Sequence, residues 1–201
     1  TLQLLFFFFI ALYAFPPRVY LPDPAPLDAY AYEWPNFFSL PVLMLMIITI
    51  LNDGTLCCIG YDNAIASPFP ERWNLPALFV ASISLGVVAC FSSLILLYFC
   101  LTSWEPNNLF QVWGIGGLVY GQIINVMFLK VAATDFLTLV SSRTQEDFFF
   151  SSNPSLILWI GASIALSAST LLALLWPIGE LDHLPVYGLA YESGNLIALW
   201  V

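Results

Sequence analysis

An aspartate in the middle of an apolar stretch is the residue with the clearest chemical potential. Residues 40–51 are almost entirely apolar, the next four are Asn52, Asp53, Gly54 and Thr55, and apolar character resumes at Leu56. An ionised aspartate at the centre of a transmembrane helix costs about 2.5–3.5 kcal/mol, so a chain keeps one there only where it is neutralised, paired or used. Apolar surroundings favour the neutral carboxyl and a nearby cation favours the charged one. Asp53 is therefore a candidate proton-binding residue, the alternative being a cap on a half-helix.

The same four residues predict a break in the helix that carries them. Asn, Asp and Gly are poor helix formers, and unwinding at Gly54 would expose backbone carbonyls beside the Asp53 carboxylate. Discontinuous helices of this kind build ion sites near the middle of a membrane. We therefore expect the span to be discontinuous at residues 52–55, with Asn52 and Thr55 as candidates for the ion path.

A second pair of charges, Lys130 and Asp135, lies in another apolar stretch. Five residues correspond to about 500° of helical rotation, so the two side chains do not share one face cleanly. Lys130 could extend to the membrane interface, and Asp135 could face Asp53 or cap a water-filled pocket. An ion-path role and a structural role both remain open for this pair.

Other kinds of site are not recognisable in the sequence. There is no Ser/His/Asp or Cys/His nucleophile, and the glycines near residue 115 follow no strand, so they do not form a phosphate-binding loop. The four cysteines lie in or beside apolar stretches and are interpreted as small buried residues. His183, the single histidine, is expected to be an ordinary solvated side chain. No catalytic residue, metal site or cofactor is expected in this chain.

The composition indicates that the chain is embedded in a lipid bilayer. Of 201 residues, 60% are hydrophobic and only 8% charged, and the mean hydropathy is +0.88, whereas soluble proteins have about 25% charged residues. The net charge of −9, with four Lys and Arg residues, also excludes nucleic acid as a partner.

Five apolar stretches are suited to crossing a membrane, at about residues 2–15, 38–59, 75–101, 119–142 and 155–176. A spanning helix needs roughly 20 residues, so the first stretch is expected to be the remainder of a longer helix. Residues from Asn195 onward are expected to begin a further span. The predicted fold is an all-α polytopic bundle forming one membrane domain over residues 1–201.

Charge in the loops predicts the orientation. Arg72 and Arg143 lie in loops on one side of the membrane and Arg18 lies on the other. Because basic residues favour cytoplasmic loops, loops 60–74 and 142–154 are expected to be cytoplasmic.

The order of the motifs resembles the plasma-membrane proton-pumping P-type ATPases. Residues 51–55 resemble the sixth transmembrane helix of that family. Residues 61–64, 67–68 and 73–76 resemble the loop and the entry to the seventh helix. Residues 129–144 resemble the eighth helix and its exit, residues 154–176 the ninth, and residues 1–17 the rest of the fifth, in a form most similar to trypanosomatid pumps.

The resemblance implies a plasma-membrane pump that couples ATP hydrolysis to proton export, with Asp53 at the position of the family's proton acceptor and donor. In plant members an arginine of the fifth helix faces that aspartate. The matching position here is Gln3, which is a candidate for the ion path, and Lys130 becomes a candidate to supply the charge that the arginine provides in those members. The phosphorylated aspartate and the nucleotide-binding head, which use ATP and Mg, would lie before Thr1, so this chain would need that N-terminal half to hydrolyse ATP.

Two alternatives remain open. A P-type pump for calcium or another divalent metal would need several oxygen ligands, and Asn52, Thr49 and Thr55 lie near Asp53 without a second carboxylate. A secondary transporter or a structural multi-spanning protein would also accommodate a broken helix with one acid.

Overall fold

The computed structural model describes residues 2–21, 33–61, 74–113, 117–142, 155–177 and 179–189. Most of this part of the chain is helical. The elements are α1 (Leu2–Ala14), the 3-10 helix η1 (Pro17–Tyr20), α2 (Val42–Ile59), α3 (Leu75–Leu101), α4 (Leu109–Val112), α5 (Tyr120–Ser142), α6 (Leu156–Leu175), β1 (Gly179–Leu181) and β2 (Leu184–Val186). Four of them, α2, α3, α5 and α6, are long and apolar enough to cross a membrane. The predicted multi-span helical bundle is confirmed at this level, and the span expected from Asn195 lies outside the described residues.

Local capping explains where two of the long helices begin. The side chain of Asn74 accepts a hydrogen bond from the Ala77 amide at the start of α3, and Ser155 accepts one from the Leu158 amide at the start of α6. Each bond satisfies a backbone donor that has no partner inside the helix. The helix α2 differs, because Pro41 precedes it and provides no side-chain cap.

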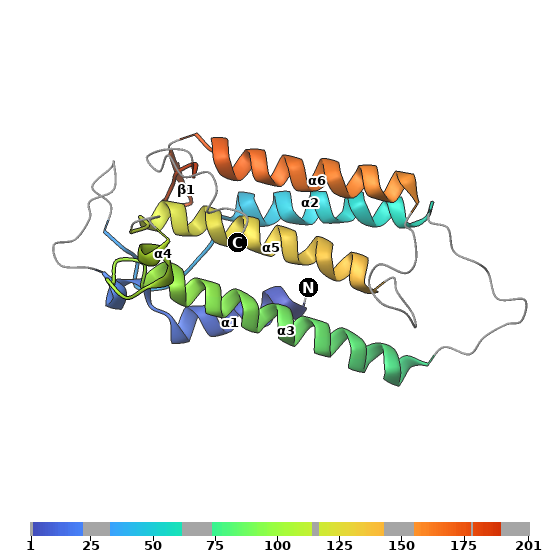
Figure 1. Ribbon diagram of the computed structural model, residues 1–201, viewed down its shortest axis with the longest axis horizontal. Coiled ribbons are helices and arrows are strands. Elements are labelled where there is room, and N and C mark those ends of the chain that lie inside the picture. The colour runs from blue at the N-terminus through green and yellow to red at the C-terminus, as the bar shows by residue number, and fades with distance from the viewer. Residues whose placement is uncertain are drawn as a thin grey trace, which may run out of the picture.

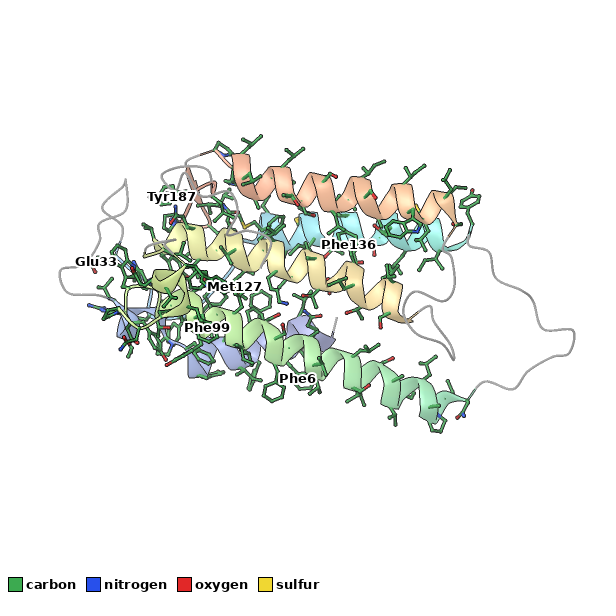
Figure 2. All side chains as sticks on the ribbon, in the orientation of Figure 1. Phe6, Glu33, Phe99, Met127, Phe136 and Tyr187 are labelled. Atoms are coloured by element: carbon green, nitrogen blue, oxygen red, sulfur yellow. The ribbon has the colours of Figure 1, made fainter. Side chains whose placement is uncertain are left out.

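The helix α5 is the centre of the bundle. It packs against α2, α3 and α6, while α1 packs against α3, and Figure 1 shows α5 between α3 and the α2–α6 pair. Met127 and Phe136 of α5 are buried, whereas Phe6 of α1 is half exposed (Figure 2). Within the apolar 18-residue segments of these helices, 61% of α5 is buried but only 17% of α2, so the described bundle leaves most of α2 uncovered.

The expected break in the second span is wrong, because α2 is one continuous helix from Val42 to Ile59. A glycine inside a helix costs about 1 kcal/mol relative to alanine, whereas each backbone group left without a partner in lipid costs several. Continuity is therefore the less costly arrangement. The hydroxyl of Thr55 and the thiol of Cys58 also bond back to the carbonyls of Leu51 and Gly54, within the same helix.

A two-stranded antiparallel hairpin lies where only a loop was expected. Leu181 pairs with Leu184, so Asp182 and His183 form a two-residue turn. Both have positive φ, 51° and 63°, as a type I′ hairpin turn requires, and Asp and His adopt this conformation more readily than most residues. Figure 1 shows the hairpin at the same end of the bundle as α4.

Candidate functional site

Asn52 and Asp53 occupy different faces of α2. Met44, Ile48 and Thr55 form the buried side of the helix, and Asn52 is half-buried next to that side, whereas Asp53 is exposed. Successive residues of a helix point about 100° apart, so only one of the two polar side chains can face α5. That residue is Asn52.

Asn52 connects α2 to α5 through a side-chain hydrogen bond. Its Nδ2 donates to Oδ2 of Asp135 at 3.4 Å, a distance at the long end for such a bond. The two helices pack along each other, so residues 83 positions apart in the sequence meet between two spans. The structure thus brings together two of the predicted candidates, and the group that faces Asp135 is the amide of Asn52.

Asp53 and Gly54 lie on an open face of α2. A Cβ added at Gly54 would meet no atom within 4 Å, and Asp53 has no hydrogen-bond or ion-pair partner among the described residues. A carboxylate facing lipid in this way would be energetically unfavourable. This face therefore requires either water or contacts beyond those that the described bundle provides.

The other candidate residues are separate from this pair. Thr55 is buried, and its hydroxyl donates to the Leu51 carbonyl at 3.0 Å. Lys130 is half-buried on α5 and forms no ion pair with a carboxylate in the described ranges. Gln3 is only 5% exposed, and its Nε2 has no partner within the described part of the chain. The counter-ion role of Lys130 and the ion-path role of Gln3 stay predictions.

The sequence interpretation missed a set of polar contacts at the hairpin end of the bundle. The side-chain amide of Asn125, which is fully buried, donates to the Tyr187 carbonyl, and Oδ2 of Asp182 accepts from the Val42 amide at 2.7 Å. Figure 2 shows Tyr187 at this end of α5. The position of Asn125 in an apolar stretch could have indicated that its side chain bonds to another element. No local sequence pattern connects positions 42 and 182.

Proton binding and metal coordination need different numbers of ligands. Among the residues described, no three His, Cys, Asp or Glu side chains cluster closely enough to hold a metal ion. A hard divalent cation needs six to eight oxygen ligands, whereas one carboxylate suffices to take up and release a proton.

Comparison with known proteins identifies the relatives of the chain, although no family model matches it. It is 44% identical over 208 residues to the probable proton ATPase 1A of Leishmania donovani, an alignment that covers 100% of this chain and 20% of the relative. Probable proton ATPase 1B of the same organism is also 44% identical, over 210 residues. Plasma membrane ATPase 2 of Saccharomyces cerevisiae is 35% identical over 119 residues, or 58% of this chain.

The chain is thus homologous to plasma-membrane proton ATPases, and the resemblance predicted from its motifs is confirmed. It spans about a fifth of the length of the Leishmania relatives that it matches.

Proposed function

From this homology we propose that the chain forms part of the membrane domain of an ATP-driven, proton-exporting P-type pump, and that Asp53 is the carboxyl group that carries the proton. The observation that carries the proposal is the 44% identity to the Leishmania proton ATPases over the whole chain. ATP and Mg would act on the part of the pump that these 201 residues do not include. In this proposal α2 to α6 correspond to the sixth to ninth helices of the family, with α4 in a loop.

The open face of α2 supports the choice of Asp53. A proton carrier must exchange its proton with water or with a neighbouring group, so it cannot be sealed inside a packed bundle. Asp53 is exposed beside Gly54, where an added Cβ would meet no other side chain or packed helix within 4 Å. The Leishmania relative is about five times as long as this chain, and in a pump of that length segments outside these 201 residues would cover this face and control access to the carboxyl group.

Asn52 and Asp135 have a supporting role in this proposal. Their hydrogen bond joins the helix of Asp53 to the central helix α5. It fixes the rotation of α2 about its axis, because Asn52 can face α5 only when Asp53 is turned away from it. Asp53 is thereby directed to the open face.

The experiment is ATP-driven acidification of vesicles that contain the reconstituted full-length pump with the substitution Asp53→Asn. Asparagine keeps the size and hydrogen-bonding capacity of a protonated aspartate, but it cannot release the proton. We expect transport to be abolished while nucleotide binding is retained. Folding should survive, because a neutral isostere removes an unfavourable charge from a membrane-spanning helix.

Asp135→Asn is the matched control, because the same change at Asp135 keeps an oxygen that can accept from Asn52. We expect this variant to retain transport. If Asp53→Asn pumps at the wild-type rate and Asp135→Asn does not pump, the proton acceptor is Asp135. Normal pumping by both variants would exclude both carboxyl groups, and uptake of a metal ion without acidification would identify a pump for another cation.

A further inference from the structure

The segment 179–189 holds three helices at one end of the bundle. Asp182 in the turn accepts a hydrogen bond from the first amide of α2, and the Tyr187 carbonyl accepts one from Asn125 near the start of α5. The amides of Gly188 and Leu189 donate to carbonyls at the end of α6, those of Trp176 and Ala173. The hairpin thus contacts both helices that carry the candidate site, α2 and α5.

The contact with Asp182 provides α2 with a hydrogen-bond acceptor at its N-terminus, which the helix otherwise lacks. Its first residue, Val42, follows Pro41, which has no side chain able to accept a hydrogen bond. The Val42 amide is one of the first four N–H groups of α2, which have no carbonyl acceptor within the helix, so it needs an acceptor outside it. The carboxylate of Asp182, 140 residues further along the chain, is that acceptor. Its negative charge also interacts favourably with the positive end of the helix dipole.

The turn geometry makes this contact specific to position 182. Asp182 and His183 are the two central residues of the hairpin turn, both at positive φ. Glu180 lies two residues earlier on β1 and is also exposed and acidic. Of these two acids of the hairpin, the structure places Asp182 on the Val42 amide.

We propose that Asp182 is a positioning residue for proton transport, which sets the position of α2 through its N-terminal amide; this inference rests on the proposed function. Asp53 lies eleven residues after Val42, or about 16 Å along a helix that rises about 1.5 Å per residue. Because α2 is continuous, a displacement of its capped end is transmitted to Asp53. Among the described residues, two side-chain hydrogen bonds link this helix to other elements, one from the Val42 amide to Asp182 at its end and one from Asn52 to Asp135 in its middle.

The test is a double-mutant cycle in the reconstituted full-length pump, with the number of protons transported per ATP hydrolysed as the readout. Asp182→Gly removes the acceptor and keeps a residue that adopts positive φ without strain. Val42→Pro removes the donor at the first helical position, where proline is favoured. The extended backbone of Pro41 (φ −55°, ψ 139°) is compatible with a following proline.

We expect each single substitution to lower the number of protons per ATP, because the loss of one helix cap shifts the equilibrium between the positioned and the displaced helix about fivefold. The double variant should be no worse than either single one, since both remove the same bond. Asp182→Asn should retain most of the wild-type ratio, because it keeps both the acceptor oxygen and the turn. Glu180→Gln, which removes the neighbouring charge, should leave the ratio unchanged.

Two outcomes would overturn the proposal. If the effects of Asp182→Gly and Val42→Pro add, the two residues do not act through one bond. If both variants lower the unfolding temperature but keep the wild-type number of protons per ATP, the cap stabilises the fold without positioning Asp53. Failure of the proposed function is distinct from these, because the wild-type pump would then transport no protons or Asp53→Asn would transport them normally.

Discussion

Polar side chains are used differently in the middle of the spans and at the hairpin end of the bundle. In the spans, many hydroxyl groups donate to a carbonyl of their own helix. These include Thr49, Thr55, Ser93, Thr134, Thr138 and Ser169. At the hairpin end, side chains bond to other elements, as Asp182 does to Val42 and Asn125 to Tyr187.

This difference has a mechanical consequence. A hydroxyl group bonded within its own helix does not restrict the position of that helix relative to its neighbours. Hydrogen bonds between elements do restrict it. The hairpin end therefore holds α2, α5 and α6 in fixed relative positions, and the middle of α2 is joined to α5 through the long Asn52–Asp135 bond.

The largest effect is expected where the hairpin segment contacts α6. A Cβ at Gly188 would lie 2.5 Å from the Leu174 carbonyl oxygen and 2.9 Å from the Trp176 backbone nitrogen. These are backbone atoms that cannot rotate away, so Gly188→Ala should displace the segment and destabilise the fold by about 3 kcal/mol. The measurement is the thermal unfolding of the purified full-length pump in detergent.

Gly179→Ala is the control for this prediction. Gly179 lies in the same segment, but a Cβ there would come no closer than 4.0 Å to its nearest neighbour, the Pro177 carbonyl oxygen. We expect its unfolding temperature to match that of the wild type. Equal stability of Gly188→Ala and Gly179→Ala would contradict the conclusion that the hairpin end of the bundle is rigid.

A smaller effect is expected at Asn125. This side chain is fully buried, and it supplies a donor to the Tyr187 carbonyl in another element. Asn125→Ala removes that donor, which should destabilise the protein by about 1 kcal/mol. Ser169 is equally buried but bonds to the Ala165 carbonyl of its own helix, so Ser169→Ala should change stability by less than about 0.5 kcal/mol. An equal loss in the two variants would remove the distinction between the two regions.

The sequence predicted the elements whose formation depends on local composition. The apolar stretches at 75–101 and 119–142 correspond to α3 and α5 almost to the residue, because length and hydropathy determine where a helix can cross a bilayer. The membrane setting also explains the error in α2. Helix propensities predicted a break at Gly54, but they do not include the penalty for unpaired backbone groups in lipid.

The contacts that hold the candidate site were beyond prediction from sequence for a different reason. Asn52 and Asp135 are 83 residues apart, and Val42 and Asp182 are 140 apart. No periodicity or motif relates such positions. The hairpin turn was also missed, because Asp-His lacks the glycine of the commonest turn sequences. Asp53 could be chosen as a candidate from its position in an apolar stretch alone. Its exposed orientation became apparent only from the structure.

The smallest effect is expected for Thr55→Val, which tests the comparison two residues after Asp53. Thr55 was a candidate for the ion path, but its side chain is buried and its hydroxyl donates to the Leu51 carbonyl. Valine has nearly the same shape, and removal of a hydroxyl bonded within its own helix changes helix stability little. We therefore expect the unfolding temperature and the rate of vesicle acidification both to stay at wild-type values. A loss of acidification without a loss of stability would show that the Thr55 hydroxyl takes part in proton movement. In that case a polar group bonded within its own helix would still have a functional role near Asp53, and the contrast with groups that connect two elements would not hold there.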